Sequence, residues 1–243
     1  MAFPIVKGKA TSTGAASTTH TVTLPDDIEA GELLLVFFAH IGRYSNTAEV
    51  DEESSGPGWH SLRYYRYGLS NSTNGATIGV FYKRADGNES TLVIKTPASV
   101  ASAHIVYRLA QAESVSSSAT GNYSSNANPP NHNISVTKDA LWFAAVSKRG
   151  AAPSAGPSGY SDFTVSSGSN INCASAYLDL RASSNNPGAF TSGNNYWAAA
   201  TIAVIGRIEA NTELSSRAIL TARPWYGVGA KFESASTFFS FCG

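Results

Sequence analysis

TVTLPDDIEAGELLLVFFAH, residues 21–40, is the stretch that decides the fold of this 243-residue chain. Residues 33–38 within it are apolar at every position, without the alternation of a strand that has one solvent-facing side. The run therefore predicts a central β-strand covered on both faces, whose outer face meets another chain or a covering loop. Before it, Pro25 predicts the start of a polar turn, and Gly31 predicts its end, just before the strand.

Further short runs rich in Val, Ile, Tyr, Phe and Thr lie between clusters of Gly, Pro, Asn and Ser, and helical periodicity is scarce. Alternation is clearest where Ile78, Val80 and Tyr82 share one face of a run. The pattern predicts an all-β, antiparallel sandwich. The expected strands are residues 19–24, 32–40, 60–67, 76–84, 91–96 and 103–109, followed by 134–137, 140–147, 162–166, 172–181 and 197–206.

These strands form a weak internal repeat. The first half runs TVTLPDDIEAGELLLVFFAH, GPGW, FYKRADGNES and SAHIVYRLA, and the second runs ISVTKDALWFAAVSKR, GPSGY, SAYLDLRASSNNPGAF and YWAAATIAVIG. Both halves have the order strand, aromatic turn, strand and closing strand. Two similar sets of strands predict two facing sheets, the layout of a jelly-roll-like sandwich with two pseudo-repeated halves.

The domain organisation follows from this repeat. We expect an N-terminal arm at residues 1–18, a β-sandwich domain at 19–206 and a C-terminal tail at 207–243. The halves, 19–111 and 132–206, are joined by residues 112–131, which are rich in Ser, Asn and Pro and predict a long crossing loop. Neither half shows an obvious core of its own, so this loop is not expected to be a flexible linker between domains.

Composition disfavours several classes of partner. The chain has 17 basic and 17 acidic side chains, so it lacks the basic excess with which a protein releases counterions from nucleic-acid phosphates. No stretch approaches the roughly 18 apolar residues of a membrane span, and the N-terminus has no apolar region of secretory length. We therefore expect no nucleic acid and no membrane as partner. Cys173 and Cys242 either pair over a long loop or remain two thiols, and the low cysteine content favours thiols.

The motifs of common catalytic sites are not found. No Gly-x-Ser-x-Gly turn occurs, and the histidines stand singly, without the i, i+2 or i, i+4 spacing of metal ligands. We therefore expect no enzyme, no cofactor and no metal site. The five histidines are His20, His40, His60, His104 and His132.

Two groups of residues leave alternatives open. The acidic cluster Glu49, Asp51, Glu52 and Glu53 could bind calcium or supply a carboxylate pair for glycoside hydrolysis, but a solvated loop is the preferred interpretation. Trp59 follows a Gly-Pro-Gly turn, where its ring could cover the end of the sandwich or stack on a sugar, and the buried role is the commoner one.

Two aromatic segments are candidate interfaces. On a strand, Arg63, Tyr65 and Tyr67 share one face, and this mixture of cation and aromatics can stack sugars or bases but is also favoured at protein interfaces, which we prefer. The tail holds apolar side chains that would be costly to leave in water, so they are expected to dock on the same chain or on a neighbouring subunit. These tail residues are Pro224, Trp225, Tyr226, Phe238, Phe239 and Phe241.

Over residues 19–206 the chain resembles a domain that recurs in bacteriophage virion proteins and related bacterial proteins. The pieces that carry the resemblance are LPDDIEAGELLLVFF, GPGW, YKRADGNES, HIVYRLA, DALWFAAV and WAAATIAVIG. The resemblance implies a place in a virion and no activity. Such proteins include capsid decoration, tail and fibre proteins, with no catalytic residues to carry over.

The resemblance leads to two expectations. The first is a virion structural protein, made in the host cytoplasm: a capsid decoration or cement protein that binds the major capsid protein or other virion proteins. By analogy of fold it would form a homo-oligomer, for example a trimer. The alternative is a tail or fibre module that recognises a glycan receptor through tyrosines, tryptophans and amide-rich loops.

Overall fold

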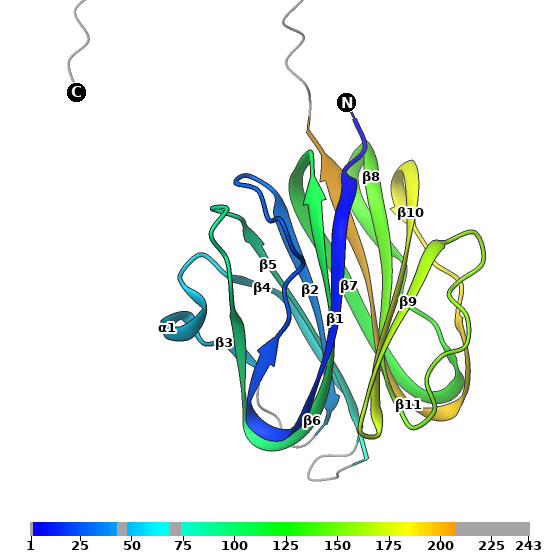
Figure 1. The fold of residues 1–243 in the computed structure, drawn as a ribbon. Coiled ribbons are helices and arrows are strands. Elements are labelled where there is room, and N and C mark those ends of the chain that lie inside the picture. Colours follow the sequence, from blue (N-terminus) through cyan, green and yellow to red (C-terminus); the bar gives the residue numbers. More distant parts are fainter. Residues whose placement is uncertain (1, 43–47, 69–73, 208–243) are drawn as a thin grey trace, which may run out of the picture. The chain divides into compact units, whose positions relative to one another are not determined.

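The structure is a computed structural model that describes residues 2–42, 48–68 and 74–207. These residues form two facing antiparallel sheets and one short helix, α1 (Glu52–Ser55), as Figure 1 shows. No helix in this part of the chain has the length and apolar character needed to cross a membrane. The strands are β1 (Ile5–Val22), β2 (Leu33–Ile41), β3 (Glu49–Val50), β4 (His60–Tyr67), β5 (Ala76–Arg84), β6 (Leu92–Ala110), β7 (Ala112–Ala127), β8 (His132–Arg149), β9 (Ser161–Gly168), β10 (Ile171–Asn185) and β11 (Phe190–Gly206).

The two sheets repeat one strand pattern. The first sheet has the order β1-β6-β2-β5-β4, with β3 paired to β6, and the second has the order β7-β11-β8-β10-β9. With β3 set aside, each strand of the second half takes the position of its counterpart in the first. The predicted all-β antiparallel sandwich with two pseudo-repeated halves is therefore confirmed. The likeness to a jelly roll is limited to the presence of two facing antiparallel sheets, because each half keeps all its strands in one sheet.

Strand β2 is the predicted central strand covered on both faces. Its odd-numbered residues, such as Phe37, lie in the core between the sheets, and its even-numbered residues, such as Val36, lie in a second apolar cluster on the outer side of the first sheet. The chain itself covers that outer side, since Val22, Trp59 and Ile94 belong to the same cluster. The outer face of β2 is therefore covered by the chain itself, through strand ends such as Val22 and loop residues such as Trp59.

A bent ribbon of β1 and β6 provides much of this cover. Residues 5–14 pair with 102–110, and after register shifts residues 19–22 pair with 92–95. In Figure 1 the two strands bend together at the bottom and turn back upward beside the sheet. The bend places the end of β1 and the beginning of β6 over the outer side of β2, which explains why a whole apolar run is stable there.

Two predicted segments are wrong. The arm at residues 1–18 is mostly strand β1, and the crossing loop at 112–131 is mostly strand β7. Both are edge strands of their sheets. Small and polar side chains suit such positions, because one face stays in solvent and the backbone bonds to the neighbouring strand need no particular side chain. The predicted strands 91–96 and 103–109 are likewise one strand, β6, and 134–137 and 140–147 are one strand, β8.

Candidate functional site

The edges of the two sheets meet along two seams. Residues of β1 contact residues of β9 on one side, which we call the β1–β9 seam. Residues of β4 contact residues of β7 on the other, which we call the β4–β7 seam. Because all four are edge strands, their outward backbone groups need partners other than a further strand.

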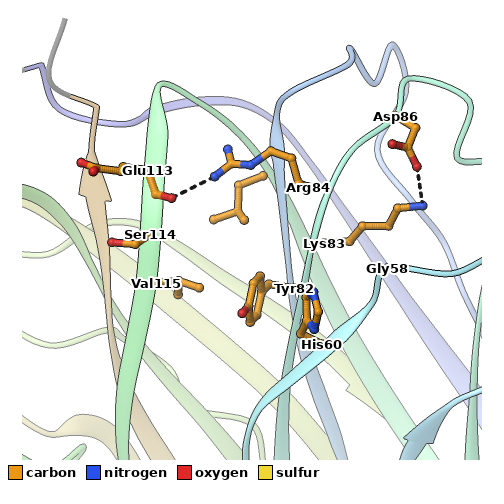
Figure 2. A pocket seen from close by; sticks show the side chains of 10 residues that line it. Gly58, His60, Tyr82, Lys83, Arg84, Asp86, Glu113, Ser114 and Val115 are labelled. Carbon is orange, nitrogen blue, oxygen red and sulfur yellow. Dashed lines mark hydrogen bonds and ion pairs between the residues drawn. The ribbon is translucent and has the colours of Figure 1, made fainter. Parts of the chain in front are cut away.

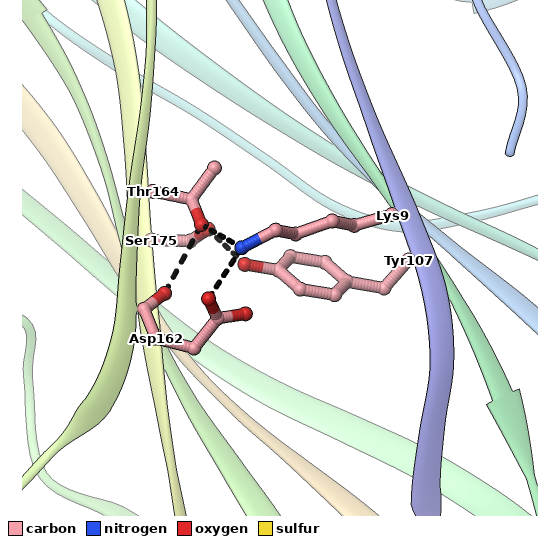
Figure 3. Close-up of polar contacts among 5 residues, drawn as sticks. All are labelled: Lys9, Tyr107, Asp162, Thr164 and Ser175. Atoms are coloured by element: carbon pink, nitrogen blue, oxygen red, sulfur yellow. Dashed lines mark hydrogen bonds and ion pairs between the residues drawn. The ribbon is translucent and has the colours of Figure 1, made fainter.

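At the β1–β9 seam, polar side chains join the sheets (Figure 3). The Lys9 ammonium forms an ion pair with Asp162 and donates a hydrogen bond to Thr164 Oγ1 at 2.8 Å. Nearby, Tyr107 and Ser175 share a hydrogen bond of 2.9 Å, and burial raises the pKa of Tyr107 to about 12. Each of these groups has a partner within the sandwich, so this seam has a structural role.

The predicted residues Arg63, Tyr65 and Tyr67 lie together on the β4–β7 seam. Arg63 Nη2 donates to the carbonyl oxygen of Ser117 on β7 at 2.8 Å. Tyr65 and Tyr67 lie against Gly121, where an added Cβ would come within 3.1 Å of Tyr65 Cε1 and 2.5 Å of Tyr67 Cβ. The structure thus brings the three residues together, and their role in an interface remains a prediction.

The group of aromatic side chains extends from β4 onto β11 and β7. The Tyr67 and Tyr196 ring centroids lie 6.4 Å apart, and those of Tyr196 and Tyr123 lie 4.7 Å apart in an edge-on arrangement. Tyr123 is 51% exposed and lies within residues 112–131, the segment predicted to be a crossing loop. Because β7 is a strand, Tyr123 instead pairs directly with Tyr196 on β11.

Replacing Gly121 by Val is expected to lower the free energy of unfolding by about 1–3 kcal/mol, because the new side chain would overlap Tyr67 and the carbonyl oxygen of Trp197. Urea unfolding followed by circular dichroism measures the change. Gly193→Ala is the matched control, because a Cβ there meets no atom within 4 Å. Equal stability of the two variants would contradict the close packing of β4 on β7.

A groove of about 420 Å³ lies at the end of this seam where β7 begins (Figure 2). Leu33, Tyr82 and Val115 form its apolar part, and the His60 ring lies beside Tyr82 with centroids 5.1 Å apart. Figure 2 shows Arg84 reaching from β5 toward β7 above these rings. Concave surfaces with an apolar floor and a few polar groups are the usual form of ligand sites.

Two cations of the groove differ in their partners. Burial disfavours the charge of Lys83, but hydrogen bonds and ion pairs with Glu89 at 3.0 Å and Asp86 at 3.1 Å raise the pKa of Lys83 above its usual value. Arg84 donates only to carbonyl oxygens, and burial, followed by repulsion from Arg207, lowers the pKa of Arg84. Arg84 is therefore a cation without a carboxylate partner among the described residues.

The acidic cluster and Trp59 come together elsewhere. Glu49, Glu52 and Trp59 line a second pocket of about 330 Å³, while a hydrogen bond from Lys95 holds the pKa of Asp51 below its usual value. Trp59 is 6% exposed, in keeping with the buried role. Within the residues that the structure describes, no group of three or more His, Cys, Asp or Glu side chains could hold a metal ion.

Sequence reasoning missed an association of histidines. Ser102 Oγ lies 2.8 Å from both His20 Nδ1 and His104 Nε2, His20 continues to Thr96, and His104 continues to Ser12. The bend of β1 and β6 creates this chain of hydrogen bonds, so no sequence spacing could have revealed it. Its members are hydroxyls and imidazoles without a carboxylate, and Ser102 is buried, so the geometry is not that of a catalytic triad.

The other predicted residues are the two cysteines and the aromatic residues of the tail. Cys173 is a buried free thiol in the core, where burial raises the pKa of Cys173, and Cys242 lies outside the described residues. The tail residues Pro224, Trp225, Tyr226, Phe238, Phe239 and Phe241 also lie outside them. The described chain ends beside its beginning, since Arg207 hydrogen-bonds through its backbone to Ala2 and Gln111.

Comparison with known proteins gives no relative: no protein-family model, no curated protein and no solved structure matches this chain.

Proposed function

We propose that this chain is a non-enzymatic structural protein of a virion, made in the host cytoplasm, and most simply a capsid decoration or cement protein. The observation that carries the proposal is that the sandwich closes its own edges. Side chains already occupy carbonyl oxygens of two edge strands, β1 and β7: Ser166 Oγ donates to Ser12, Arg63 to Ser117, and Arg84 to Ala112 and Glu113.

This closure fits a rigid unit that sits on a surface. Open edge strands pair with strands of other chains and cause uncontrolled association, whereas occupied edges prevent it. Contacts with a shell would then use exposed side chains and the tail. Candidate contact residues on β4 and β7 are Arg63 and Tyr123, which are exposed, and Tyr65 and Tyr67, which are partly buried.

The place where the tail begins also supports the proposal. The backbone bonds of Arg207 to Ala2 and Gln111 fix the point at which the described chain ends. The tail sequence beyond it carries six apolar residues of the PWY and FFSF segments. Burying apolar surface contributes roughly 25 cal/mol per Å², so even a small tail contact becomes strong when it is repeated over a particle. Partners would be the major capsid protein, other virion proteins or further copies of this chain.

Deleting residues 208–243 is expected to leave the sandwich folded and to abolish its incorporation into particles, because the deletion removes the apolar tail but no described strand. Far-ultraviolet circular dichroism and thermal melting check the fold of the truncated chain. Immunogold electron microscopy of purified particles then compares full-length and truncated chains carrying the same epitope tag. Equal labelling of particles by both chains, or no labelling by the full-length chain, would contradict the proposal.

A further inference from the structure

The groove beside the β4–β7 seam combines an aromatic floor with an uncompensated cation. Figure 2 shows Tyr82 and His60 side by side below Arg84, with Val115 facing them from β7. His60 is exposed, Tyr82 is partly exposed, and both rings line the cavity of about 420 Å³. A flat ring surface of this kind suits the apolar face of a sugar ring.

Some N–H groups of the Arg84 guanidinium have no hydrogen-bond partner within the described chain. Its Nη1 donates to the carbonyl oxygens of Gly31 at 3.1 Å and Ala112 at 2.8 Å, and its Nη2 donates to that of Glu113 at 3.1 Å. A guanidinium has five N–H groups, so within the described chain Nε and one N–H of Nη2 have no partner. Paired N–H groups of arginine bind a carboxylate through two parallel hydrogen bonds.

The surrounding charges favour an anion. Asp86 and Glu89 are engaged by Lys83, and in Figure 2 the side chain of Glu113 leaves β7 on the side away from Arg84. Arg207 adds a second positive charge near Arg84. An arginine fixed by three carbonyl oxygens is also held in place before a ligand arrives, which reduces the entropy lost on binding.

A peptide is a poorer fit than a sugar. Extended peptides bind at sheet edges through the free backbone groups of an edge strand. Here the carbonyl oxygens of Ala112, Glu113 and Ser117 on β7 already accept hydrogen bonds from Arg84 and Arg63. What stays accessible along this edge is side-chain surface, with the aromatic floor at one end and Tyr65 and Tyr67 farther along β4.

We propose that this groove is a binding site for a saccharide that bears a carboxylate, such as a hexuronic or sialic acid. The carboxylate binds Arg84, and the apolar face of the sugar ring lies on Tyr82 next to His60. The seam toward Arg63 and Tyr65 accepts the next sugar of the chain. This site does not depend on the proposed place in a virion, because it rests only on residues of the sandwich.

The test is isothermal titration calorimetry of the full-length chain with trigalacturonic acid and with sialyllactose, using neutral lactose for comparison. At least one acidic sugar is expected to bind about tenfold or more tightly than lactose, and its affinity should fall as salt is added. Failure of both acidic sugars to bind, or equal binding of lactose, would overturn the proposal.

Variants locate the site. Arg84→Gln is expected to weaken binding of the acidic sugar by about 10- to 100-fold, the range for a lost charged hydrogen bond. His60→Ala changes an exposed ring, so its folding should be unaffected while binding weakens severalfold. Tyr123→Ala is the control, an exposed tyrosine that does not line the groove, and should bind normally. Unchanged affinity in both Arg84→Gln and His60→Ala would place any binding elsewhere and overturn the assignment.

Discussion

Acidification from pH 7 to pH 4 is expected to lower the free energy of unfolding by about 5 kcal/mol through His40 and His104 alone. Burial lowers the pKa of His40 to about 4 and that of His104 to about 3. In the unfolded chain both rings take up a proton near pH 6.5. The folded state remains neutral until a lower pH, so stability present above pH 6.5 is lost progressively as the pH falls toward 4.

The contacts of these rings explain the shift. His40 lies 2.8 Å from the Tyr64 hydroxyl and hydrogen-bonds to the carbonyl oxygen of Ile41, and His104 stacks on Phe38 with centroids 5.0 Å apart. No carboxylate appears among these contacts. Burial is the largest cause of both shifts. Repulsion from His20 and Arg66 further lowers the pKa of His40, and repulsion from His20 further lowers the pKa of His104. The pKa of His20 is itself lowered by burial.

Urea unfolding at pH 7, 6, 5 and 4 measures this loss. The His104→Gln variant is expected to lose less stability per pH unit than the wild-type chain, because one of the two strongly shifted groups is gone. His60→Gln is the matched control, because it removes an exposed histidine instead of a buried one. A stability that is constant from pH 7 to pH 5, or the same slope in His104→Gln as in the wild type, would show that the buried rings do not act in this way.

Replacing Phe143 by Ala is expected to lower the free energy of unfolding by about 3–5 kcal/mol, the usual range for truncation of a buried aromatic side chain. Phe143 belongs to the second sheet, and its ring lies 5.7 Å from Phe37 and 4.9 Å from Tyr107, which belong to the first. The truncation therefore removes packing between the sheets. Guanidinium unfolding followed by tyrosine and tryptophan fluorescence measures the loss.

The same experiment tests whether the two halves depend on each other. Because the main apolar cluster contains residues of both sheets, wild type and Phe143→Ala should each unfold in one transition. Tyr123→Ala, at an exposed position, should cost less than about 1 kcal/mol. Two separate transitions, or an equal cost for both variants, would contradict a core that is shared by the halves.

The strands that carry apolar side chains could be predicted from the sequence alone. Residues 60–67 and 76–84 were predicted with the bounds of β4 and β5, and residues 32–40 nearly match β2. In these runs the side chains themselves report burial, because alternation or continuous apolarity reflects contact with one or two packed layers. The repeat was visible for the same reason, since corresponding strands bury corresponding faces.

Strand β7 and the part of β1 before residue 19 could not be predicted in this way. The sequence of β7, rich in Ser and Asn, and that of β1, rich in Thr, Ser and Gly, contain too few apolar residues to signal a strand. Their conformation comes from backbone pairing with β11 and β6, which a local pattern does not contain. This is why an arm and a crossing loop were predicted where the sheets in fact end.

The sequence by itself determined an all-β sandwich of two repeated halves, because apolar periodicity is a property of neighbouring residues. Only the tertiary structure decided which polar groups meet. Leu33, His60, Arg84 and Val115 line one groove because strands of the first sheet meet the beginning of β7, which belongs to the second sheet, at the β4–β7 seam. His20 and His104 share Ser102 because the ribbon of β1 and β6 pairs across the bend. Such contacts depend on how sheets close and bend, and this is set by the sum of many weak packing interactions across the whole chain.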